Sequence, residues 1–386
     1  MVRPIRSIHV LALVLALVPF AFRPARALPL FARQYSMPCT QCHVAFPRLN
    51  DFGMKFLRSG YILEGSEGQS PWESQNFPFS IVGNVGMDLS SADAREDGDR
   101  TRSTLTQFRQ NWVEFHAAGT LAKKISYHFD SGFEEDVNGT NALQSGQAFV
   151  QFDELAKGGA LNLKVGVFDA EVPYLASSRR TMQADYMAPV TLDGEGFEFN
   201  GERQGWAYAL GLINSQREHG APSDHTLNRL EDPYLWVMGN FQGQRVAARV
   251  LADRQNPRKP AGSASLRLQV DASACFTYRK LMVIPAYIFE RFDDPDAETP
   301  NRIDHGLLEA LLPLDKESRW VLTGRYELQH TPKTDLIAES DLWLGALDLG
   351  CYVNPNAKVG VDWAHLGNNT GEPYVDELQA YIHIGF

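Results

Sequence analysis

The segment "RWVLTGRYELQ", residues 319–329, shows the pattern that decides the fold. Its large apolar residues share one face of an extended chain: Trp320, Leu322, Tyr326 and Leu328. The opposite face carries polar residues such as Thr323, Arg325 and Glu327. Alternation with a period of two places one face of a strand in an apolar medium and the other in a polar one. The segment is therefore predicted to be a strand with one face in an apolar medium and the other in a polar medium.

The same period recurs along most of the 386 residues. Predicted strands begin near residues 77, 106, 123, 145, 161, 190, 204, 232, 244, 264, 281, 303, 317, 339, 356 and 374. Short connectors alternate with longer polar ones, and the longer set includes the stretch from Asp169 to Pro189. This alternation is typical of a transmembrane barrel with tight periplasmic turns and longer outer loops. A soluble β-sandwich also has alternating strands, but it does not need this rhythm. Residues 76–386 are predicted to form an all-β, antiparallel transmembrane barrel of about 16 strands.

The C-terminal segment "YVDELQAYIHIGF", residues 374–386, supports a bacterial outer membrane as the location. Leu378, Ile382 and Phe386 share one face, while Gln379 and His383 lie on the other. An amphipathic last strand with a terminal Phe resembles the sorting signal of outer-membrane proteins. Closure of the barrel would leave no strand edge exposed to lipid.

Residues 1–27 read as an export signal. Arg3 and Arg6 precede the apolar run "VLALVLALVPFAF", and "ARA" supplies a cleavage site of small residues. Removal of the four arginines of this segment would change the net charge from −11 to −15. So acidic a chain does not favour nucleic acid as a partner.

A second motif, "MPCTQCHVAF" at residues 37–46, predicts a cofactor. The spacing Cys39-x-x-Cys42-His43 is the covalent attachment sequence for haem c: the thiols bond to the haem and the histidine binds its iron. A structural zinc site would need four ligands, and the next histidine of the exported chain is His116. A thioredoxin-type dithiol would need a βαβ context, which the strand pattern does not provide.

Residues 28–75 are predicted to form a small helical monohaem segment. The stretch 45–61 following the motif has a helical period whose apolar face would cover the porphyrin: Phe46, Leu49, Gly53, Phe56 and Leu57. A unit of this size cannot build a sufficient core alone, so the barrel lumen is its expected surrounding.

The sixth iron ligand stays open between a methionine and a histidine of the barrel. Met54 follows His43 by eleven residues, and a thioether would raise the haem potential. His116 or His128 would serve from the lumen wall. The two remaining cysteines, Cys275 and Cys351, lie in separate strand-like segments and are expected to be unpaired thiols.

Residues 28–61, "LPLFARQYSMPCTQCHVAFPRLNDFGMKFLRSGY", closely resemble the N-terminus of fused outer-membrane cytochrome–porins, a family that includes iron oxidases of Fe(II)-oxidising bacteria. The resemblance rests on "FARQ", the Cys39-x-x-Cys42-His43 motif, "FPRLNDFG" and "SGY". It implies one haem c in or beneath a barrel, with Cys39 and Cys42 as anchors and His43 as proximal ligand. It also implies transfer of electrons from extracellular donors to periplasmic carriers.

Three functions are consistent with these features. The first is electron transfer between an extracellular donor, Fe(II) by resemblance, and periplasmic cytochromes, which would make the chain an Fe(II)-oxidising cytochrome of the outer membrane. The second is a diffusion porin with a haem-bearing plug. The third is outward electron transfer to an extracellular acceptor, since the direction depends on a potential that the sequence does not determine.

Overall fold

The computed structural model describes residues 30–63, 79–96, 99–135, 141–214, 232–241, 244–255, 265–293, 301–333, 339–354, 356–369 and 374–385. The predicted signal peptide 1–27 and the terminal Phe386 lie outside the described residues.

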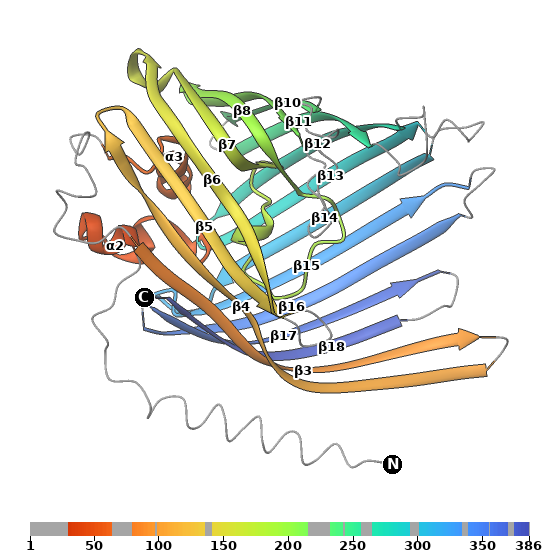
Figure 1. The fold of residues 1–386 in the computed structure, drawn as a ribbon. Helices are drawn as coiled ribbons and strands as arrows, with labels where there is room; N and C mark the ends of the chain where they lie inside the picture. The colour runs from red at the N-terminus through yellow and green to blue at the C-terminus, as the bar shows by residue number, and fades with distance from the viewer. Residues whose placement is uncertain are drawn as a thin grey trace.

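Sixteen strands, β3 to β18, form one closed antiparallel barrel (Figure 1). Consecutive strands pair with each other, and β18 pairs with β3 to close the ring, for instance through Tyr381 opposite Gly86. The strands are β3 (Phe79–Glu96), β4 (Asp99–Ala122), β5 (Ile125–Glu135), β6 (Asn141–Ala156), β7 (Leu161–Glu171), β8 (Thr191–Arg203), β9 (Trp206–Asn214), β10 (Asp232–Phe241), β11 (Gln244–Gln255), β12 (Ser265–Tyr278), β13 (Leu281–Asp293), β14 (Asn301–Pro313), β15 (Trp320–Thr331), β16 (Ser340–Asn354), β17 (Ala357–Asn368) and β18 (Tyr374–Gly385).

The predicted barrel is confirmed, and most strands begin within a few residues of the expected positions. The main difference is β4, which begins at Asp99 rather than near residue 106. Its first residues pair with the end of β3, for example Arg100 with Arg95. They are polar on both faces, so they carry no period of two to reveal the strand.

The apolar face of the strands points outward. In β15, Trp320, Leu322 and Leu328 expose 44%, 38% and 48% of their surface, whereas Thr323 and Glu327 of the same strand are buried inside. This arrangement is the reverse of a soluble protein, and it matches a wall that faces lipid outside and a polar lumen inside. The closed ladder satisfies the backbone groups that lipid cannot. Among the described helices, none is long and apolar enough to cross a bilayer.

Two segments occupy the lumen. The first, here called the N-terminal segment (residues 30–63), contains α2 (Leu30–Tyr35), the short 3₁₀ turn η2 (Cys39–Gln41), the strand pair β1 (His43–Ala45) and β2 (Arg48–Leu49), and α3 (Asp51–Arg58). α2 and α3 lie at the end of the barrel where β18 ends (Figure 1). That end carries the short turns, such as Lys123–Lys124 between β4 and β5.

The second segment, here called the lumen loop (residues 172–190), connects β7 to β8 and includes a short 3₁₀ turn, η4 (Ser177–Arg179). It crosses to the opposite wall, where Lys358 of β17 donates to the carbonyl of Thr181 at 2.7 Å. The backbone N–H of Met187 donates to Glu327 of β15 at 3.0 Å. The sequence predicted one of the longer connectors here, and the structure confirms its length and adds that it folds inward.

The helix predicted over residues 45–61 is shorter than expected. α3 begins only at Asp51, and the preceding residues form the β1–β2 pair. Pro47 cannot donate a helical hydrogen bond, and Asn50 starts the helix by accepting from the N–H of Gly53 at 2.9 Å. The apolar period before Asn50 therefore belongs to a compact turn.

The lipid-facing surface gives a first prediction. Leu347 lies mid-strand in β16 and is half exposed to the outside. Leu347→Arg should reduce the free energy of unfolding by about 2–4 kcal/mol, the cost of Arg near the bilayer midplane. Urea unfolding in lipid vesicles would measure it. Leu314→Arg, at the β14–β15 turn and equally exposed, is the control with an expected loss of about 0–1 kcal/mol. Equal losses would contradict the assigned lipid face.

Candidate functional site

The Cys39–His43 motif forms a tight turn held by α3. The N–H of Cys42 donates to the carbonyl of Cys39 at 3.2 Å, and the carbonyl of Cys42 accepts from Asn50 at 2.9 Å. The Asn50 side chain donates to the carbonyl of Gln41 at 3.0 Å. At Gly53 a Cβ would lie 2.2 Å from the Cys42 carbonyl, so only glycine lets the helix approach the turn this closely.

The imidazole of His43 is oriented for coordination. Its Nδ1 lies 3.1 Å from the carbonyl of Pro47, which fixes Nδ1 as the donor and leaves the lone pair of Nε2 available. Loss of hydration in the lumen lowers the pKa of His43 to about 4, so the ring is neutral at physiological pH. Burial also raises the pKa of the Cys39 and Cys42 thiols.

A cavity of about 360 Å³ lies between the N-terminal segment, the barrel wall and the lumen loop. Cys39, Cys42, His43 and Met54 all line it. The volume is in the range of cofactor pockets. The five apolar residues expected to cover a porphyrin line the same cavity: Phe46, Leu49, Gly53, Phe56 and Leu57. The structure thus brings together every site residue that the sequence predicted.

The donor set of this cavity fits haem c. Two thiols and a neutral histidine with a free nitrogen are its attachment groups, and the apolar residues suit a porphyrin face. Arg58 also lines the cavity; its Nη2 pairs with Glu202 at 2.8 Å, while its buried Nε and Nη1 have no partner among the described residues. Such unpaired cationic donors suit the carboxylates of haem.

Buried polar contacts attach the N-terminal segment to the wall. Arg48 of β2 forms an ion pair with Glu309 of β14, and both side chains are buried. Arg48 also donates to the Tyr186 hydroxyl of the lumen loop at 3.1 Å, and that hydroxyl donates to Glu309 at 3.0 Å. Tyr352 of β16 donates to the carbonyl of Phe46 at 2.5 Å. Segment, loop and wall therefore form one connected network.

Sequence reasoning missed the lumen loop as a wall of the site. Pro173 and Arg179 of this loop line the cavity, and Val172, Tyr174 and Leu175 are buried. A usable signal was present, because "VPYLA" at residues 172–176 is too apolar for a solvated outer loop. His383 of β18 was also missed as a site residue; it lines the cavity and its buried Nε2 has no partner among the described residues.

The two other cysteines are unpaired, as expected. Cys275 is buried in an apolar cluster, where it accepts from Arg245 at 2.8 Å. Cys351 is half-buried in β16.

With this geometry, the barrel is similar to solved outer-membrane channels. The anion-selective porin from Comamonas acidovorans has a TM-score of 0.57 at 12% identity, covering 80% of this chain and 99% of the porin. The outer-membrane channel DcaP of Acinetobacter baumannii has a TM-score of 0.58 at 9% identity, covering 80% of this chain and 97% of DcaP. OmpF of Salmonella typhi, solved in complex with daunomycin, has a TM-score of 0.53 at 12% identity, covering 80% of this chain and 97% of OmpF.

The chain has the porin fold. Sequence comparison adds nothing beyond it: no protein-family model matches the chain, and no curated protein matches it. At these identities the likeness establishes the closed barrel fold and not the chemistry of its lumen.

The attachment network gives the second prediction. Arg48→Met leaves Glu309 as a buried, unpaired charge, a change that costs about 3–5 kcal/mol. The amides of α3 should then exchange with solvent roughly two to four orders of magnitude faster in hydrogen-exchange mass spectrometry.

The control is Asp51→Asn, which removes a segment-to-wall ion pair with Arg245 in which Asp51 is 79% exposed. An exposed ion pair contributes about 0–1 kcal/mol, so the exchange rate of the α3 amides should change little in this variant. Equal exchange in the two variants would contradict the role of Arg48.

Proposed function

We propose that this chain is an outer-membrane electron-transfer protein that carries one covalent haem c in its lumen. The proposed donor is extracellular Fe(II), and the proposed acceptors are periplasmic cytochromes. One observation carries the proposal: Cys39, Cys42 and the oriented His43 line a single cavity inside a closed barrel. The N-terminal segment sits at the short-turn end, the periplasmic side of such barrels.

The roles of the residues follow from their chemistry. Cys39 and Cys42 would hold the porphyrin through thioether bonds, and His43 would bind the iron through Nε2. When bound, the haem iron takes up and releases one electron. Met54, in α3, is the proposed sixth ligand because its thioether lines the same cavity. Arg58 would pair with a haem carboxylate.

The barrel makes this function physically useful. Its apolar band is about 25 Å tall, which separates an external donor from a periplasmic acceptor. A redox centre held between donor and acceptor would replace one long electron transfer with two shorter ones. The same arrangement would serve outward transfer, in which case the acceptor is extracellular; the haem potential decides the direction.

The third prediction tests the haem and its donor together. Expressed with cytochrome-maturation machinery, the exported chain should gain the mass of one haem, and anaerobic Fe(II) should reduce the haem absorption band at physiological pH. Cys39→Ala should lower covalent haem content at least tenfold. Cys351→Ala, which removes a thiol outside the cavity, is the control and should keep the haem. A wild-type chain without the added mass would overturn the proposal.

The likeness to channels favours a second candidate, a diffusion porin in which residues 30–63 fill only part of the lumen. Under this function small solutes pass through the lumen, and the haem, if attached, has a minor role. The two functions differ in how much of the lumen stays open.

Conductance measurements give the fourth prediction. In planar bilayers the intact chain should conduct weakly, because the N-terminal segment and the lumen loop both occupy the lumen. Deletion of residues 30–63 should raise the conductance severalfold, while Leu314→Arg, outside the lumen, should leave it unchanged. A high conductance in the intact chain that the deletion does not change would favour the porin over the plugged carrier.

A further inference from the structure

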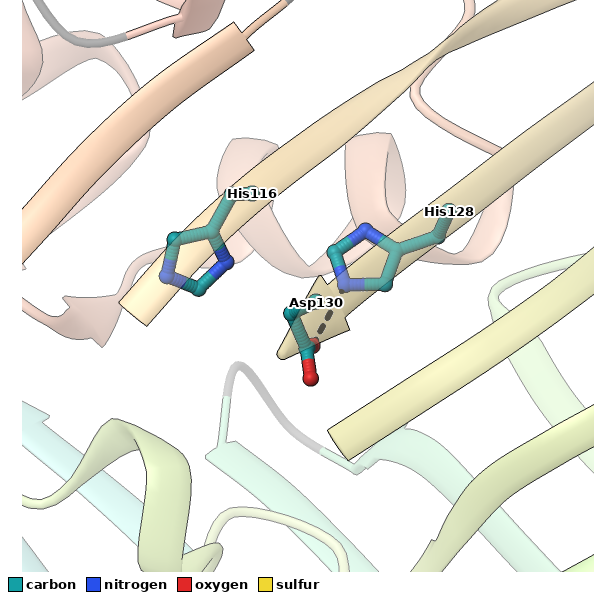
Figure 2. Close-up of side chains that lie close together, drawn as sticks. All are labelled: His116, His128 and Asp130. Atoms are coloured by element: carbon teal, nitrogen blue, oxygen red, sulfur yellow. Dashed lines mark hydrogen bonds and ion pairs between the residues drawn. The ribbon is translucent and has the colours of Figure 1, made fainter. Parts of the chain in front are cut away.

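A cluster of potential metal ligands lies on the inner wall of the barrel, beside the N-terminal segment. His116 of β4 pairs directly with Asp130 of β5 across the sheet, and His128 precedes Asp130 by two residues. The period of two therefore places all three side chains on one face. Their ligand atoms lie within 4.8 Å of one another, and the side chains turn toward a common space (Figure 2). All three line the cavity that contains the haem motif.

We propose that His116, His128 and Asp130 bind one divalent transition-metal ion of the ferrous iron class. Two histidines and one carboxylate with open positions are the ligand set typical of non-haem Fe(II). The identity of the ion as Fe(II) rests on the proposed function, in which Fe(II) is the electron donor; the existence of the site does not.

Surrounding contacts hold each ligand in place. Glu114 contacts Nε2 of His116 at 3.1 Å, which leaves Nδ1 of that ring for a metal. The N–H of Gln147 donates to Oδ1 of Asp130 at 2.6 Å. Contacts from outside the ligand set, such as those of Glu114 and Gln147, orient ligands in metal sites. Oδ2 of Asp130 lies 2.8 Å from Nε2 of His128, and a bound ion would replace this contact.

The ring of His128 is fixed from both sides. Tyr61 of the N-terminal segment stacks on it at a centroid distance of 5.2 Å, and Phe149 of β6 stacks on it at 5.4 Å. The side chain is only 10% exposed, and its buried Nδ1 has no hydrogen-bond partner among the described residues. The ring is held with Nε2 turned toward Asp130, so this nitrogen is the one it would present to an ion bound by both residues.

The cluster differs from the other histidine pairs of the wall. His305 pairs with Glu290, His330 with Asp341, and His365 with Asp376. In the described part of the chain, only the group at His116 brings three ligand residues within coordination range. Metal–ligand distances of about 2.0–2.2 Å require adjustment of the three side chains, which side-chain rotation can supply.

The position of the site gives it a role in the proposed function. An ion held there would share a cavity with Cys39, Cys42 and His43, so a ferrous donor would be concentrated next to the redox centre. Fe(II) would lose one electron, which the haem iron would accept, and leave the site as Fe(III). The acidic surface of the chain suits attraction of cations.

The fifth prediction uses Mn²⁺ as a probe, because it resembles Fe(II) in size and binds thiols weakly. Untagged full-length protein in an uncharged detergent is titrated with Mn²⁺, and the free ion is followed by electron paramagnetic resonance. The wild type should bind one Mn²⁺ ion per chain. His116→Gln and His128→Gln should each bind it at least tenfold more weakly, the minimum expected when a ligand is lost. Asp130→Asn removes the third ligand and should weaken Mn²⁺ binding in the same way.

His365→Gln is the matched control, since it removes a histidine–carboxylate pair that belongs to no group of three ligand residues in the described part of the chain. Heat-dependent electrophoretic mobility confirms that each variant still forms the barrel. Equal Mn²⁺ binding by the wild type and the folded His128→Gln variant would overturn the site. So would loss of the native haem spectrum in that variant with unchanged Mn²⁺ binding, because His128 would then be a haem ligand.

A kinetic experiment distinguishes failure of the proposed metal site from failure of the proposed electron-transfer function. With Fe(II) as reductant, His128→Gln should raise the Fe(II) concentration for half-maximal haem reduction at least tenfold and leave reduction by dithionite unchanged. Saturable Mn²⁺ binding in a chain that carries no haem would keep the site and reject the electron-transfer function. Haem reduction by Fe(II) with identical concentration dependence in the wild type and the variant would reject the site and keep the function.

Discussion

The structure depends on one constraint: in lipid, every backbone N–H and C=O of the wall must find a partner within the chain. The pairing of β18 with β3 meets this constraint by removing both sheet edges. Closure then separates the side chains into two groups by alternation alone. Those that face outward are apolar, and those that face inward enclose a lumen whose contents the lipid does not influence.

Polar groups inside the lumen must satisfy one another. Arg325 and Glu327 of β15 lie 2.8 Å apart, and Lys358 of β17 lies 3.3 Å from Asp348 of β16. Charges buried this deeply are costly unless they are paired and hydrogen-bonded. The lumen loop supplies further partners, since Arg325 donates to the carbonyl of Ala184 at 2.8 Å. The wall charges thus account for both the inward path of the loop and the position of the N-terminal segment.

The same packing prepares the candidate site. A segment of some thirty residues has too little core to hold a cavity open alone. Here Arg48 anchors it to Glu309, and Tyr61 packs against His128 of the wall. The haem motif and the histidine–carboxylate cluster therefore line one cavity although they come from separate parts of the chain. This proximity underlies both the proposed electron transfer and the proposed ferrous site.

The sequence alone determined the barrel and its approximate strand positions, because alternation is a local property imposed by two media on one strand. It also contained the Cys39-x-x-Cys42-His43 spacing on which the predicted haem attachment rests, because thiol and histidine spacing in a single turn is local. It did not determine the start of α3, where Pro47 and the Asn50 cap override the helical period, nor the polar start of β4, which only its partner strand reveals. Tertiary structure alone decided that the lumen loop turns inward and that His116 meets His128 and Asp130. Those contacts depend on strand register and on closure of the barrel. The hydrophobic period within a single segment carries no information about either.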